Sequence, residues 1–135
     1  MGELRDLLTR FSLRDAAADD LIERSEDQLA THLPAEYKEF LKVGNGGEGF
    51  IGESEYAIFW GVDELYSLNE SYEVATYAPG FLVFGTDGGG EAYGFDTRVE
   101  GWPIVRLPFI GMSWNEAIPL GNSFCGFLER LYRSE

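Results

Sequence analysis

The sequence is poor in the residues that most often carry catalysis or bind metals. It contains one cysteine, Cys125, and one histidine, His32, in 135 residues. A single cysteine excludes an internal disulfide, and one Cys with one His is too few for a zinc site. No apolar run approaches the ~20 residues of a membrane-spanning helix, and the acidic amino terminus is unlike a signal peptide. We therefore expect one cytoplasmic domain over residues 1–135, without a cofactor.

Basic residues are also scarce, and one long segment has none. Lys and Arg number 10 against 24 Asp and Glu, which gives a formal net charge of −14. Residues 43–97 hold ten acids and no Lys or Arg: Glu48, Glu53, Glu55, Asp63, Glu64, Glu70, Glu73, Asp87, Glu91 and Asp96. Such a segment repels phosphate backbones and anionic lipid, so binding to nucleic acid or a membrane surface is disfavoured. It would steer a basic protein toward an acidic face, although solubility alone is the alternative explanation.

The hydrophobic pattern predicts helices and strands in one chain. Helices are expected through Leu4–Phe11 and Leu21–Leu29, from Pro34 to Gly44, from Asp63 to about Tyr77, and after a Ser123 cap. Asp19 or Asp15 is expected to cap the second helix, and Asp63 the fourth. Strands are expected at Phe50-Ile51, Tyr56–Trp60, Phe81–Gly85, Ala92–Asp96 and Trp102–Leu107, the last of which starts late or lies at an edge because of Pro103. This order predicts a single α+β domain with a twisted, mainly antiparallel sheet of about five or six strands and helices packed around it.

The turn of the central hairpin, Asp87-Gly88-Gly89-Gly90-Glu91, presents carboxylates beside three glycines. We expect a positive φ at Gly89, which glycine adopts without a steric penalty. No lysine lies nearby, so a phosphate cradle is disfavoured. Asp87, Glu91 and Asp96 offer oxygen donors for calcium, but their spacing matches no EF-hand loop.

Few residues suggest catalysis. Glu53 and Glu55 alternate near a turn, where solvated carboxylates are more common than an acid–base pair. A Cys125–His32 nucleophilic pair is formally possible, but Cys125 follows Phe124 on an apolar helix, which favours a buried structural thiol. We therefore predict no catalytic residue, no metal site and no enzymatic activity.

Two tryptophans differ in their surroundings. Trp60 alternates with Ile58 and Tyr56 and is expected in the core. Trp114 lies in a loop, Gly111-Met112-Ser113-Trp114-Asn115, where it could anchor an interface or fold back as a lid on the core.

Several motifs occur in a specific order. They are Ile22 with Glu26, Leu33-Pro34-Ala35-Glu36-Tyr37-Lys38-Glu39-Phe40-Leu41, Asn45-Gly46-Gly47, Leu65 with Asn69, Phe84-Gly85-Thr86-Asp87-Gly88-Gly89-Gly90-Glu91, Tyr93-Gly94-Phe95-Asp96, and Ile118 with Ser123-Phe124 and Phe127-Leu128. Together, over about residues 20–131, they resemble the SUKH superfamily. That superfamily includes fungal Smi/Knr cell-wall regulators and many bacterial immunity proteins. The resemblance implies a non-enzymatic α+β domain that acts by binding other proteins.

The acidic charge and the resemblance together favour one function. The chain is expected to be an immunity protein that binds a basic, nuclease-type toxin and blocks its nucleic-acid groove. The alternative is a regulatory or scaffold domain of the Smi/Knr type with an endogenous protein partner. The residues expected to contact the partner are Glu53, Glu55, Asp87, Glu91, Asp96 and Trp114.

Overall fold

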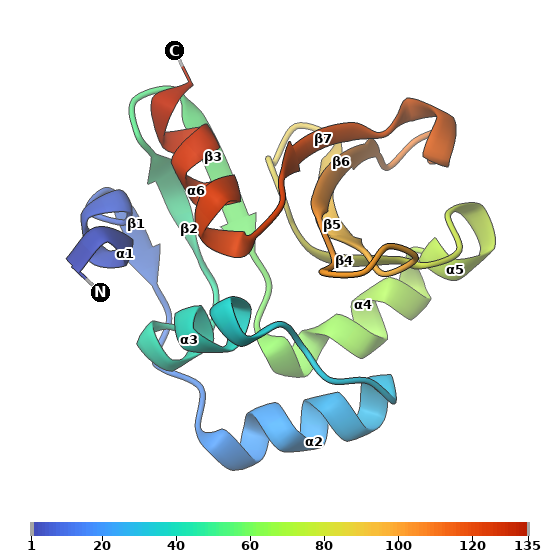
Figure 1. The fold of residues 1–135 in the computed structure, drawn as a ribbon, viewed down its shortest axis with the longest axis horizontal. Helices are drawn as coiled ribbons and strands as arrows, with labels where there is room; N and C mark the ends of the chain where they lie inside the picture. The colour runs from blue at the N-terminus through green and yellow to red at the C-terminus, as the bar shows by residue number, and fades with distance from the viewer. Residues whose placement is uncertain (1, 135) are drawn as a thin grey trace.

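The computed structural model describes residues 2–134 and shows one antiparallel sheet whose seven strands follow the order of the chain (Figure 1). The strands are β1 (Phe11–Leu13), β2 (Gly47–Ile51), β3 (Glu55–Phe59), β4 (Phe81–Thr86), β5 (Glu91–Asp96), β6 (Ile104–Pro108) and β7 (Ile118–Gly121). The α+β prediction is confirmed, with more strands than the five or six expected. The additional strands, β1 and β7, are short edge strands, and β7 contains Pro119, which an edge tolerates.

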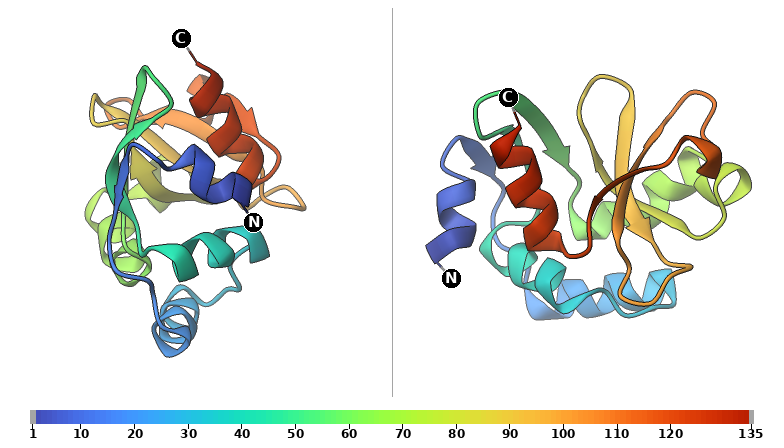
Figure 2. Two further views of the ribbon diagram at one scale, coloured as in Figure 1. Left: turned by 90° about the vertical axis from the view of Figure 1, so that its left-hand side faces the viewer. Right: turned by 45° about the horizontal axis from the view of Figure 1, so that its top comes forward.

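The helices surround the curved sheet. They are α1 (Gly2–Leu7), α2 (Asp19–Leu29), α3 (Ala35–Val43), α4 (Leu65–Ser71), α5 (Val74–Tyr77) and α6 (Phe124–Arg133), with 3₁₀ turns η1 (Val62–Glu64) and η2 (Trp114–Glu116). Helix α6 lies against the inner face of the sheet, α3 and α2 lie below it, and α4 and α5 lie beside β4 (Figures 1 and 2). Among the described residues, no helix has the length and apolar character that crossing a membrane would require.

Aromatic side chains join α6 to the sheet. Phe127 is fully buried and contacts Phe59 of β3, Phe84 of β4 and Tyr93 of β5, at ring-centroid distances of 6.0, 5.5 and 5.1 Å. Ser123 caps the helix as expected, because its side chain accepts a hydrogen bond from the backbone N–H of Gly126 at 3.0 Å. One helix therefore closes the core over three strands.

Several helix boundaries differ from the sequence prediction. Helix α2 begins at Asp19 after an Ala18 N-cap, with no side-chain cap, so neither expected aspartate caps it. The helix expected from Asp63 to Tyr77 is divided into η1, α4 and α5. The division before α5 lies at Glu73, whose backbone adopts the left-handed conformation with φ 55°. The amphipathic spacing extends across this break, but a left-handed residue cannot continue a right-handed helix.

Two glycines let the turn after α3 lie close to its neighbours. Gly46 has φ 82°, and a Cβ there would lie 2.4 Å from the carbonyl oxygen of Phe59. Gly47 has φ 142°, and a Cβ there would lie 2.1 Å from the carbonyl oxygen of Ser12. Since no side chain fits either space, this turn requires two glycines.

Candidate protein-binding surface

The antiparallel order of the strands brings two acidic turns to the same end of the sheet. Successive strands alternate in direction, so the turns β2–β3 and β4–β5 lie at one end, together with the β6–β7 loop (Figure 2). Glu53 occupies the first turn and Asp87 the second, and Glu53 is exposed. The structure therefore places carboxylates that lie far apart in the sequence at the same end of the sheet.

The β2–β3 turn is held by the end of α6. Ser54 Oγ donates a hydrogen bond to the carbonyl oxygen of Ser134 at 2.9 Å, and Ser134 Oγ donates to Glu55 Oε2 at 3.1 Å. Glu53, Tyr132 and Arg133 line a hollow of about 640 Å³ between this turn and α6. Of the two predicted carboxylates, Glu53 is exposed, whereas Glu55 is half-buried and already holds the helix end.

The carboxylates of the β4–β5 turn also have internal partners. Asp87 Oδ1 accepts hydrogen bonds from the backbone N–H groups of Gly89 and Glu91, at 2.7 and 3.1 Å, and thereby shapes the turn. The Glu91 carboxylate lies 3.5 Å from Nε of Arg106 on β6. Both acids are half-buried, so each combines a structural contact with partial access to solvent.

Asp96 does not lie on an exposed surface, which corrects the sequence interpretation. It is 7% exposed at the end of β5. Its carboxylate accepts hydrogen bonds from the backbone N–H, Nε and Nη2 of Arg98, at 3.1, 3.0 and 3.2 Å. The Arg98 side chain lowers the pKa of Asp96, although burial opposes the shift. Asp96 therefore fixes the turn after β5.

Trp114 lies over the core as a lid. Its Nε1 donates a hydrogen bond to the carbonyl oxygen of Pro79 at 2.8 Å, and its ring meets Phe81 edge-on at 5.6 Å. Arg98 covers the ring, with the guanidinium carbon 3.5 Å from the ring centroid. Of the two roles considered from sequence, the contacts support the lid. Trp60 is 8% exposed, as expected of a core residue.

The ten acids of residues 43–97 are carried by three separate parts of the fold: the β2–β3 hairpin, the segment from η1 to α5, and the β4–β5 hairpin. Figure 1 shows the β2–β3 turn and α5 on different sides of the molecule. Three of the ten form ion pairs with arginines, as Glu64 with Arg14, Glu91 with Arg106 and Asp96 with Arg98. The acidic residues therefore form separate groups, where the sequence had predicted one acidic face.

The candidate nucleophile and base have different surroundings. The His32 side chain is 95% exposed, and its Nδ1 lies 3.9 Å from Glu26. Cys125 is half-buried, less buried than expected, and its backbone N–H donates to Glu36 Oε1 at 3.1 Å. Among residues 2–134 that the structure describes, no group of three or more His, Cys, Asp or Glu side chains could hold a metal ion.

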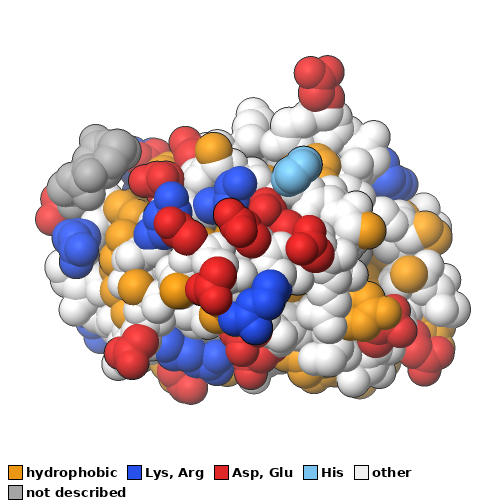
Figure 3. Space-filling model, turned by 90° about the horizontal axis from the view of Figure 1, so that it is seen from below, with side chains coloured by type: hydrophobic (Ala, Val, Ile, Leu, Met, Phe, Trp, Pro, Cys, Tyr) orange, Lys and Arg blue, Asp and Glu red, His pale blue; other side chains and the backbone are white. Residues whose placement is uncertain are grey.

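A hollow of about 810 Å³ lies along α2 and α3, with Glu26, His32, Lys38 and Lys42 in its lining. Figure 3 shows this face, on which acidic and basic side chains are interspersed around the histidine. Glu26, which is largely buried, accepts the backbone N–H of Leu33 at 2.7 Å and lies 3.4 Å from Nζ of Lys38. These contacts satisfy the Glu26 carboxylate, so Glu26 joins the end of α2 to the start of α3.

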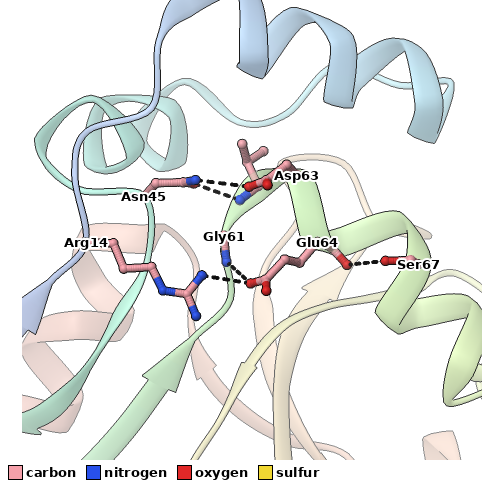
Figure 4. A network of polar contacts seen from close by, with 7 residues as sticks. Arg14, Asn45, Gly61, Asp63, Glu64 and Ser67 are labelled. Carbon is pink, nitrogen blue, oxygen red and sulfur yellow. Dashed lines mark hydrogen bonds and ion pairs between the residues drawn. The ribbon is translucent and has the colours of Figure 1, made fainter.

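The asparagines of the sequence motifs also have structural partners. Asn45 Nδ2 donates to Asp63 Oδ1 at 3.0 Å, and Asn45 Oδ1 accepts from the backbone N–H of Val62 at 2.8 Å. Figure 4 shows this network, in which Glu64 also accepts from Arg14 and from the backbone of Gly61.

Asn69 makes a similar connection from α4. Its side-chain amide donates to the carbonyl oxygen of Val83 and accepts the Val83 N–H, each at 2.9 Å, near the end of the short β3–β4 pairing. The motif residues Asn45 and Asn69 therefore hold loops and strands together.

A protein-family profile matches residues 16–130, and this match decides the family. The chain belongs to the SMI1/KNR4 family (SUKH-1). The resemblance proposed from the motifs is thus confirmed over most of the chain. No curated protein matches the sequence.

Exposed aromatic residues were not predicted as part of a binding surface. Tyr72 and Tyr77 were assigned to one long helix, and Phe109 and Ile110 received no role. Tyr72 is 48%, Tyr77 56% and Ile110 94% exposed. The sequence pattern places Tyr72, with Leu65 and Leu68, on the inner face of one continuous helix, but Tyr72 follows the last residue of α4 and about half of it is exposed.

Proposed function

We propose that this SUKH-1 domain is a non-catalytic immunity protein that neutralises a basic, nuclease-type toxin by direct binding. The observation that carries the proposal is the acidic segment 43–97, without Lys or Arg, in a domain of a family that includes immunity proteins. An acidic surface accelerates the capture of a basic partner and competes with nucleic acid for the partner's binding groove.

The residues proposed for contact follow from exposure. Glu53 is exposed on the β2–β3 turn, and Asp87 and Glu91 remain partly accessible on the neighbouring β4–β5 turn. Glu55 contributes at the margin, because it also binds Ser134. Asp96 and Trp114 are omitted, since Arg98 and the core already contact them.

The decisive experiment is growth rescue with a toxin domain encoded next to this gene. Co-expression of the immunity domain should restore growth, and a Leu128→Asp variant, which places a charge at a fully buried position, should not. In vitro, toxin activity should fall in proportion to added domain and reach its minimum at a 1:1 ratio. Inhibition at far below one equivalent would indicate catalysis and contradict the proposal.

A second function rests on the same family membership. The SMI1/KNR4 family includes regulators of cell-wall synthesis, so this domain could bind an endogenous partner as a regulator or scaffold. Affinity capture from the native cell separates the two functions: a stable complex in cells that lack any toxin gene supports regulation.

A further inference from the structure

An exposed tyrosine is oriented by contacts with two other aromatic rings. Tyr72, directly after α4, is stacked on Trp60 with a centroid distance of 6.0 Å and an interplanar angle of 6°. Its ring also contacts Phe109, directly after β6, at 4.7 Å. These residues, here called the aromatic platform, come from three separate segments. Neighbouring rings orient Tyr72 although about half of it is exposed.

Exposed apolar residues also occur on the segments that carry Tyr72 and Phe109 or follow them. Ile110 follows Phe109 and is 94% exposed, which leaves nearly its whole side chain in water. Tyr66 on α4 and Tyr77 on α5 are 40% and 56% exposed. Single exposed apolar residues are ordinary, but exposed residues joined to a fixed aromatic ring are typical of an interaction site.

Two glutamates lie close to Tyr72 in the sequence. Glu73 directly follows Tyr72, and Glu70 lies four residues after Tyr66 on α4, where i,i+4 side chains are neighbours. Both glutamates are exposed, and neither takes part in an ion pair among the residues that the structure describes. Glu73 has a left-handed backbone, at a cost that most non-glycine residues avoid.

We propose that the aromatic platform binds an arginine side chain presented by a protein partner. The planar guanidinium would stack on Tyr72 and pair with Glu70 or Glu73, while Ile110 covers the apolar stem. The same combination already occurs inside this molecule, where Arg98 lies on Trp114 and pairs with Asp96. This inference rests on the proposed binding of a protein partner, but not on that partner being a toxin.

The chemistry of the aromatic platform and its nearby glutamates favours arginine over lysine and over a second copy of this chain. A lysine would supply the charge but not the planar group that stacks on an aromatic ring. A second copy of this chain would bring its own Glu70 and Glu73 to the same face and add like charges to a chain of net charge −14.

The test is an NMR titration of the folded domain with two blocked heptapeptides. They differ only in a central Arg or Lys between leucines, so their charge is equal. We expect the amide signals of Tyr72, Glu73 and Ile110 to shift, and the Arg peptide to bind about threefold more tightly than the Lys peptide. Tyr72→Ala should reduce binding, whereas Tyr132→Ala, at a similarly exposed tyrosine of α6, should not.

A variant that preserves the packing provides a second measurement. Glu73→Gln removes a charge without disturbing the rings, so it should weaken both peptides and keep the preference for Arg. Equal binding of the two peptides, or shifts spread over the carboxylates of both hairpins, would overturn the proposal. Shifts that depend on protein concentration without peptide would do the same, by identifying a second copy as the occupant. This titration does not depend on growth rescue. If the domain rescues growth but shows no preference for the Arg peptide, toxin binding stands and the toxin-binding surface lies outside the aromatic platform.

Discussion

Arg98 lies over the ring of Trp114, with its guanidinium carbon 3.5 Å from the ring centroid, while its Nε donates to Asp96 at 3.0 Å. Trp114 in turn binds the carbonyl oxygen of Pro79. These contacts join the turn after β5, the loop after β6 and the segment before β4. Two residues that the sequence suggested for partner contact therefore stabilise the fold.

Removing the Asp96 charge should destabilise the domain. Asp96→Asn loses the carboxylate that accepts from the Arg98 side chain through both oxygens, so the free energy of unfolding should fall by about 1–2 kcal/mol. Urea denaturation measures the change, and Glu100→Gln on the exposed turn nearby is the matched control. If both variants unfold at the same urea concentration, the Asp96 contacts contribute nothing to stability.

The sequence predicted the elements whose pattern is local. The β4–β5 hairpin, the late start of β6 after Pro103 and the Ser123 cap of α6 agree with the structure, because alternation, proline and capping act within a few residues. The family resemblance was also correct, since its motifs hold the framework together.

The contacts that the sequence did not predict depend on residues distant in sequence. The internal role of Trp114 requires Pro79, 35 residues away, and the Glu91–Arg106 pair requires the adjacent strand β6. The break at Glu73 left no local signal, because Glu is an ordinary helix residue. Charge counting placed ten acids in one segment but could not show that the fold distributes them among three parts.

The glycine turn offers a matched pair of substitutions. The positive φ expected at Gly89 occurs instead at Gly88 and Gly90, with φ 80° and 108°. Gly90→Ala should therefore lower the free energy of unfolding by about 1–2 kcal/mol, although a Cβ there meets nothing within 4 Å. Gly89→Ala, where the nearest contact to a Cβ is an ordinary 3.6 Å, should have almost no effect. Equal losses in thermal denaturation would contradict a conformational origin.

A glycine should stabilise the end of α2. Ala30 adopts φ 59° there, and the N–H of Thr31 bonds back to the carbonyl oxygen of Glu26 at 3.1 Å. Ala30→Gly should raise the free energy of unfolding by about 1 kcal/mol, because glycine takes the left-handed conformation without strain. Ala75→Gly, at an exposed position within α5, should lower it instead. The prediction is wrong if both alanines respond alike to urea.

Glu26 should make stability depend on pH in the acidic range. Burial alone would raise its pKa, but the Leu33 N–H, Lys38 and His32 together lower it below the ordinary value of 4.5. A carboxylate whose pKa is lower in the folded state stabilises the fold above the unfolded value, and this contribution is lost as the pH falls through the folded value. At pH 7, Glu26→Gln should cost about 1–3 kcal/mol.

The pH profile of this variant provides the sharper measurement. The difference in unfolding free energy between the wild type and Glu26→Gln should be constant above about pH 5.5 and shrink below about pH 4.5. Glu23→Gln, at an exposed position on the same helix, should show neither the loss nor the pH dependence. A constant difference down to pH 3 would mean that packing, and not the charge, explains the loss.

The role of charge in binding can be measured with the toxin domain that growth rescue identifies. Glu53→Gln combined with Asp87→Asn removes one charge from each acidic turn, and Asn can still accept the turn hydrogen bonds of Asp87. Asp20→Asn with Glu23→Gln, both exposed on α2, changes the net charge equally. The hairpin variant should slow association by about twofold per charge at low salt and leave dissociation nearly unchanged, with a smaller effect for the α2 variant.

Raising the ionic strength should remove the difference between the two variants, because salt screens exposed charges beyond a Debye length of about 8–10 Å. An association rate that does not change with salt concentration would mean that the acidic turns serve solubility. The partner-contacting surface would then lie elsewhere, and the aromatic platform would be the next surface to test.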